Sequence, residues 1–238
     1  MGVVGNTFAQ LSVSISDNVV VLDDKQRTGS IDLLNLGLDP VEFTVRTIEN
    51  NDNNALIRWA PARVLVQPNS SARLRVLARP NVKITTDEVL IKLGITSEVK
   101  RPPRTVEQAR SDERISDGIE VTVPIVPTLP MFVYFRSQGL VTPVTLGEFV
   151  ATPDDTRLVG YFPVIKPDAN KSFVGQARII NKENGQIIDQ GRLHLTYGAE
   201  RTNVQVLRTN SSSDTVLQCL QLWNQFPGQG APAYTVCR

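Results

Sequence analysis

The sequence predicts an all-β protein made of two immunoglobulin-like β-sandwich domains. Alternating apolar and polar residues recur in short runs along the chain, and this period of two is typical of strands with one buried face. Turn signals separate these runs, and no helical period is found between them. The 238 residues are enough for one large or two ordinary domains, and 41% of them are apolar, which is sufficient to build cores.

The first half contains six or seven short strands. Gly37 with Asp39-Pro40 marks one turn, and the asparagine-rich residues 50–54 mark another. This number of strands with regular turns favours an antiparallel sandwich of the immunoglobulin type. The predicted strands are residues 12–22, 30–36, 41–45, 59–66, 72–77 and 89–95.

The second half, from Met131, is predicted to form another small β-sandwich. Asn184-Gly185 lies between two apolar runs and indicates a two-residue hairpin. Further strands are expected at residues 141–149, 157–163, 172–180, 193–197, 202–207, 217–223 and 234–237. We place the boundary in the proline cluster, with residues 1–10 as an N-terminal extension or signal-peptide remnant, 11–127 as the first domain and 128–238 as the second.

Residues 118–136, GIEVTVPIVPTLPMFVYFR, join the two halves. Their first part alternates as a strand does, and Pro124 in it favours an edge strand, because proline cannot donate a ladder hydrogen bond. One interpretation is an ordinary edge strand that runs into a proline-rich linker. The other is an edge that pairs with a strand of another protein. The polar residues 98–117 before it are predicted to be a mobile loop joining two strands.

The composition excludes several kinds of function. Lys plus Arg is 25 and Asp plus Glu is 24, so no basic field for nucleic acid exists over the whole chain. No apolar run approaches the length of a membrane helix, which is about 18 residues, so no membrane insertion is expected. Neither a phosphate-binding glycine loop nor a metal-ligand cluster is found, and His194 is the single histidine. We therefore expect no cofactor, no metal and no enzymatic activity.

Cys219 and Cys237 are the two cysteines, and both lie in the last segment of the chain. They are predicted to form a disulfide in an oxidising compartment, and two buried thiols are the alternative. Thr7-Phe8-Ala9 has small residues where a signal peptidase cleaves, just before Gln10, which suggests export.

Four stretches together resemble the periplasmic chaperones of the chaperone–usher pilus pathway. They cover the opening strands, two central segments and the closing hairpins, so the resemblance extends over nearly the whole chain. The stretches are VSISDNVVVLDDKQRTGSIDLLNLG, WAPARVLVQPNSSARLRVLARP, DEVLIKLGITSEV and GQIIDQGRLHLTYGAERTNVQV.

The resemblance implies a periplasmic chaperone that stabilises incomplete pilus subunits and delivers them to an outer-membrane usher. In this family the chaperone lends an edge strand to a subunit that lacks its last strand. The implied partner-binding residues are Ile119, Val121, Val123 and Ile125. The free protein is expected to be a monomer or a weak dimer that caps its own edges.

The sequence departs from the family at the two basic residues that hold the carboxylate of the subunit. Val19 stands at the position of the usual arginine, and Thr128 stands at that of the usual lysine. Arg27, Arg136 and Lys166 are the candidate replacements. The alternative to a chaperone is a structural or adhesive two-domain β-sandwich protein of the cell surface.

Overall fold

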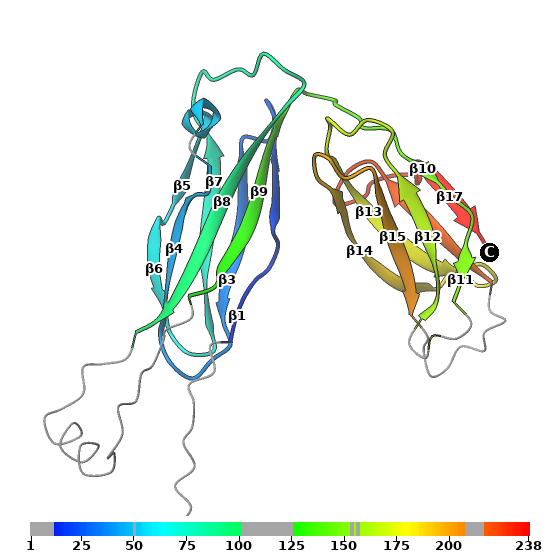
Figure 1. Ribbon diagram of the computed structural model, residues 1–238, viewed down its shortest axis with the longest axis horizontal. Helices are drawn as coiled ribbons and strands as arrows, with labels where there is room; N and C mark the ends of the chain where they lie inside the picture. Colours follow the sequence, from blue (N-terminus) through cyan, green and yellow to red (C-terminus); the bar gives the residue numbers. More distant parts are fainter. Residues whose placement is uncertain (1–11, 50, 101–125, 153–154, 156–157, 208–216) are drawn as a thin grey trace, which may run out of the picture. The chain divides into compact units, whose positions relative to one another are not determined.

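The chain forms two all-β units, as the sequence predicts (Figure 1). The computed structural model describes residues 12–49, 51–100, 126–152, 155, 158–207 and 217–238. The first unit is Met1–Gln138 and the second is Gly139–Arg238. Each unit has its own apolar core between two sheets.

In the first unit, a four-stranded sheet with the order β1-β3-β7-β5 packs on a five-stranded sheet with the order β2-β9-β8-β4-β6. A single 3-10 turn, η1 (Asp52–Leu56), precedes β5. The strands are β1 (Val13–Ile15), β2 (Val19–Leu22), β3 (Thr28–Asn35), β4 (Val41–Thr47), β5 (Ile57–Ala60), β6 (Arg63–Val66), β7 (Ser70–Ala78), β8 (Glu88–Val99) and β9 (Thr128–Arg136).

The predicted strand 12–22 is two strands in different sheets. β1 pairs antiparallel with β3, whereas β2 pairs parallel with β9 in the other sheet. The carboxylate of Asp17 accepts a hydrogen bond from the backbone N–H of Val19 at 3.0 Å, which fixes the bend between them. Because β1 and β2 are continuous in sequence, this crossing ties the two sheets together at one border of the sandwich.

The predicted strand 59–66 is also divided. β5 belongs to one sheet and β6 to the other, and Pro61 lies between them. Proline has no N–H to donate, so neither ladder continues through it. Ala62 instead accepts a hydrogen bond from the N–H of Val45 through its carbonyl oxygen.

In the second unit, one sheet has β12 flanked by β15 on one side and by the short β10 and β11 on the other, and the second sheet has the order β14-β13-β16-β17. Phe162, Leu220 and Leu222 are fully buried between the sheets. The strands are β10 (Thr145–Leu146), β11 (Val150–Ala151), β12 (Leu158–Ile165), β13 (Phe173–Asn181), β14 (Ile187–Leu195), β15 (Arg201–Leu207), β16 (Gln218–Trp223) and β17 (Tyr234–Cys237).

The predicted boundary after residue 127 is wrong, because β9 belongs to the first unit. All nine residues of β9 pair with β8, and the division falls between Gln138 and Gly139. The boundary is predicted in the proline cluster because prolines usually mark linkers, but here the cluster extends into a strand. The predicted strand 141–149 is likewise reduced to β10, with Pro143 before it and Gly147 directly after it.

The hairpin predicted at Asn184-Gly185 exists, but its loop is longer than two residues. Asn181 donates its backbone N–H to the carbonyl oxygen of Gln186, so four residues lie between the paired positions. Gly185 has a φ of 70°, the left-handed region that glycine adopts without a steric penalty. Asn184 has no positive φ, whereas a two-residue turn of type I′, which Asn-Gly favours, requires two such residues.

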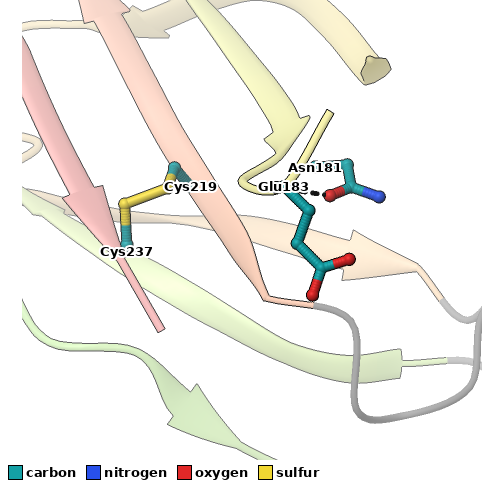
Figure 2. The surroundings of a disulfide bond; sticks show 4 residues. All are labelled: Asn181, Glu183, Cys219 and Cys237. Carbon is teal, nitrogen blue, oxygen red and sulfur yellow. Dashed lines mark hydrogen bonds between the residues drawn. A yellow bond between two sulfur atoms is a disulfide. The ribbon is translucent and has the colours of Figure 1, made fainter. Parts of the chain in front are cut away.

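The predicted disulfide between Cys219 and Cys237 is confirmed (Figure 2). The two residues are directly opposite each other on β16 and β17. β17 has only four residues and, among the described strands, pairs with β16 alone, and such a short terminal strand frays easily unless it is held. The bond therefore attaches the end of the chain to the sheet.

Removing the disulfide should destabilise the protein measurably. The bond closes a loop with a sequence separation of 18 residues, for which the chain-entropy relation gives about 3 kcal/mol. The double variant Cys219→Ala/Cys237→Ala should therefore unfold at a lower urea concentration than the wild type. Alkylation of the non-reduced native protein should add no mass, and a native protein that takes up two alkyl groups would contradict the bond.

Candidate partner-binding edge

The four predicted partner-binding residues, Ile119, Val121, Val123 and Ile125, lie outside the described residues, as does most of the predicted loop 98–117. The described chain resumes at Val126 and enters β9 at Thr128. Among the described residues, the candidate site therefore consists of β9 and its neighbouring strands.

β9 has two neighbouring strands along only part of its length. It pairs with β8 from Thr128 to Arg136, whereas β2 pairs with it only from Phe132 to Phe135. Within the described sheet, its N-terminal part, 128–131, therefore lies at a border. This is the part that follows the predicted partner-binding residues in the sequence.

The position of Pro130 in β9 agrees with such a border. The backbone N–H of Phe132 donates to the carbonyl oxygen of Asn18, so it points toward the β2 side. Backbone groups alternate along a strand, and residue 130 therefore also faces the β2 side, beyond the point where β2 begins. Proline at this position removes no hydrogen bond from the ladder with β8.

The side chains of β9 alternate between the two faces of the sheet. Met131, Val133 and Phe135 are buried in the core of the first unit, and Leu129 packs partly against it. Thr128 and Pro130, on the other face, are exposed. The odd-numbered residues of β9 thus face the apolar interior.

Arg136, one of the three candidate carboxylate anchors, is held by Glu88. The guanidinium Nε donates to the carboxylate of Glu88, and the two side chains are only 10% and 2% exposed. The same guanidinium lies 5.5 Å from the ring centroid of Tyr134. This buried ion pair joins the last residue of β9 to the first residue of β8. The side chain of Arg136 therefore has a structural partner within its own sheet.

Lys166, the second candidate, is fully buried in the second unit. Its ammonium group donates to the carbonyl oxygens of Asp168, at 2.6 Å, and Lys171, at 2.5 Å. These contacts satisfy a buried cation with the backbone of the turn that follows it. The structure therefore places Lys166 in a turn-stabilising role within the second unit.

Arg27, the third candidate, lies at an open surface of the first unit. One of its terminal nitrogens donates to the carbonyl oxygen of Arg79 at 2.5 Å, and the other is 3.5 Å from the carboxylate of Asp24. The guanidinium also lies 5.6 Å from the ring centroid of Phe135 in β9. These contacts orient the guanidinium while leaving the side chain 32% exposed.

A cleft of about 540 Å³ opens beside Arg27. Ala78, Pro80 and Val82 form its apolar lining, and Lys83 adds a second cation to it. With Asp24 as the one carboxylate among these lining residues, the cleft has an excess of positive charge. Sequence analysis did not find it, because residues 24–28 and 78–83 are brought together only by the pairing of β3 with β7.

At the other end of β8, Lys100 is surrounded by carboxylates. Its ammonium group hydrogen-bonds to Glu98 at 2.8 Å and lies 3.4 Å from Glu42. The hydrogen bond to Glu98 is the main cause that raises the pKa of Lys100 above its ordinary value, and Glu42 raises it further. The side chain therefore stays charged over the neutral pH range.

Two features are absent from the part of the chain that the structure describes. No group of three or more His, Cys, Asp or Glu side chains there could hold a metal ion. None of its helices is long and apolar enough to cross a membrane.

No protein-family model matches the sequence, and no curated protein matches it either. Several solved structures match over nearly the whole chain. The SafA pilin in complex with the SafB chaperone of Salmonella enterica matches with 14% identity and a TM-score of 0.47, covering 97% of each chain. The CupB2 chaperone of Pseudomonas aeruginosa matches with 14% identity and a TM-score of 0.45, covering 94% of this chain and 98% of the other.

The DraB chaperone of E. coli matches with 11% identity and a TM-score of 0.45, covering 96% of this chain and 98% of the other.

Replacing Glu88 by Gln should destabilise the first unit strongly. The change removes the negative charge of Glu88 from beside the buried guanidinium of Arg136, and loss of one partner costs about 3–5 kcal/mol in comparable buried pairs. The exposed pair of Glu98 and Lys100 provides the matched control, and Glu98→Gln should change stability by no more than about 1 kcal/mol. Urea unfolding of both variants tests this, and equal midpoints would show that the buried pair contributes little.

Proposed function

We propose that this protein is a periplasmic chaperone that captures incomplete pilus subunits through the border of β9 and passes them to an outer-membrane usher. The subunit would add a strand to this border. Ile119, Val121, Val123 and Ile125 would then fill an apolar groove of the subunit.

The main support for the proposal is that the N-terminal part of β9 has β8 as its only neighbour in the described sheet. The sequence that precedes β9 adds to this support. The odd-numbered residues of β9 face the apolar interior. The four apolar residues at 119–125 are also odd-numbered, so they continue the same alternation toward the N-terminus. An edge strand with a row of apolar side chains can pair with a strand of another protein by backbone hydrogen bonds.

The apolar row is expected to supply most of the affinity. Burial of four aliphatic side chains contributes about 6–12 kcal/mol before the costs of ordering are subtracted. A charge-assisted hydrogen bond contributes about 1.5–3 kcal/mol. The absence of the usual basic residues at Val19 and Thr128 therefore affects register more than affinity.

Arg27 is the best candidate for a cation that binds the carboxylate of the subunit. Arg136 and Lys166 have buried partners, whereas Arg27 is partly exposed beside a cleft with excess positive charge. An arginine can hold a carboxylate through two parallel hydrogen bonds.

Replacing Val121 or Val123 by Asp should abolish subunit capture and leave stability nearly intact. The charge would enter an apolar groove without a partner, whereas an exposed residue in the free protein changes stability by no more than about 0.5 kcal/mol. Val141, which is 55% exposed, offers the control Val141→Asp, which should affect neither property.

Thermal melts and a pull-down with pilin-like proteins co-expressed in the periplasm measure the two effects. A Val121→Asp protein that melts far below the wild type would place this residue in the protein's own core. That result would end the proposal in favour of a structural β-sandwich protein.

Arg27→Gln should weaken subunit binding by about tenfold or more, which corresponds to one charge-assisted hydrogen bond. Arg46 is exposed on β4 and is not one of the residues that line the cleft, so Arg46→Gln is the control. Titration of both variants with a purified subunit, and with a subunit whose C-terminal carboxylate is amidated, tests the assignment. If Arg27→Gln binds both subunits like the wild type, the carboxylate is held elsewhere.

A further inference from the structure

β15 is a border strand of the second unit. Within the described sheet its only neighbour is β12, and the two strands pair antiparallel along the whole of β15 (Figure 1). Four of the seven residues of β15 are exposed, and they alternate with three that are buried or half-buried. The exposed residues are Arg201, Asn203, Gln205 and Leu207. A long, regular border with unpaired backbone groups is a template for another strand.

The register indicates which backbone groups of β15 point away from β12. The N–H of Lys166, directly after β12, donates to the carbonyl oxygen of Glu200 at 2.7 Å, so the even-numbered residues of the two strands direct their backbone groups toward each other. On the other side of β12, the carbonyl oxygen of Pro163 accepts from the N–H of Gly147, which agrees with this assignment. The N–H and C=O groups of the odd-numbered residues of β15 therefore point toward the border.

β15 lacks the features by which border strands commonly prevent pairing. Such features are proline, lysine, a bulge and a charged side chain that points inward. The sequence of β15, RTNVQVL, includes neither proline nor lysine, and its inward positions are Thr202, Val204 and Val206. The register shift in this pair of strands comes from an extra residue on β12, between Leu158 and Gly160. The border of β15 is therefore regular and open to pairing.

The sequence of β15 is complementary to itself in one antiparallel register. With Val204 opposite Val204 of a second copy, all seven residues are paired, and each outward-pointing backbone group meets another one. Asn203 then lies opposite Gln205 of the second copy, and the amide groups of these side chains can donate to and accept from each other. Arg201 is the single charged residue of β15 and lies opposite Leu207, so no like charges face each other.

We propose that two copies of this protein associate through β15, which pairs antiparallel with its counterpart about a two-fold axis at Val204. The sheet of each second unit then continues into the sheet of the other copy. A register centred on Asn203 would pair only residues 201–205, and one centred on Gln205 only residues 203–207, so the register centred on Val204 is favoured. The proposal concerns the second unit and does not depend on the function proposed for β9.

The first test measures association of the full-length protein by sedimentation velocity. Between about 5 and 500 µM it should show a reversible monomer–dimer equilibrium, because an interface made of one strand pair is small and weak. Asn203→Pro removes an N–H that points away from β12, so it should spare the β-ladder and weaken the dimer about tenfold or more. Asn203→Gln keeps both the N–H and the amide and is the matched control, which should associate like the wild type.

The second test reads the register through charge. Leu207, which is 54% exposed, lies opposite Arg201 of the second copy in the proposed register. Leu207→Glu should therefore tighten the dimer by about fivefold and Leu207→Lys should weaken it by about fivefold, because each change acts at two symmetric positions. Val141 is 55% exposed and lies outside β15, so Val141→Glu and Val141→Lys are the matched controls and should give equal dissociation constants.

Three outcomes would overturn the proposal. They are a monomeric wild type at every concentration, equal dissociation constants for the two Leu207 variants, and full association of a folded Asn203→Pro protein. If circular dichroism shows that Asn203→Pro does not fold, the two Leu207 variants still decide. Self-association that the β15 variants leave unchanged and that Val121→Asp abolishes would assign the dimer to the border of β9 and overturn the proposal as well.

Discussion

The ladder between β8 and β9 is the interaction on which the first unit depends. Its nine residue pairs join segments that are separated in sequence by residues 100–127. β9 in turn holds β2 by parallel pairing, and β2 continues from β1 in the opposite sheet. Without this ladder, the five-stranded sheet would lose its connection to the crossing that ties the two sheets together.

The same ladder creates the candidate site. β8 covers the whole length of β9 on one side, whereas β2 covers only its C-terminal half on the other. The buried pair of Glu88 and Arg136 secures the end that has two neighbours. One half of β9 is therefore fixed in the sandwich, and the other half presents a border at which a strand can be added. A rigid strand with one free side suits recognition, because little conformational entropy remains to be lost on binding.

In the second unit, the two border strands of the sheet β14-β13-β16-β17 differ in length and in how they are held. β17 is short and is fastened by a disulfide, so it offers little backbone to a partner. β14 is long, exposed at its start and adjacent to two arginines that are stacked on aromatic rings. Both units thus expose part of a strand border, but the border of β9 follows an apolar row and that of β14 has cationic side chains.

The sequence by itself determined the all-β class, the two units and the disulfide. These three properties follow from local features of the sequence. The features are the period-two alternation, the frequent turn signals and the proximity of Cys219 and Cys237. The same alternation identified the apolar row that precedes β9, because side-chain direction in a strand depends only on position.

Tertiary structure alone decided where the units divide and which candidate cations are accessible. Pro130 resembles a linker residue, yet it lies in a strand because its missing N–H falls where β2 has not begun. Glu88 is 48 residues from Arg136, and no local pattern connects them. The cleft beside Arg27 likewise exists only because β3 pairs with β7. Such contacts depend on the pairing of strands distant in sequence, which a pattern of local periodicity does not specify.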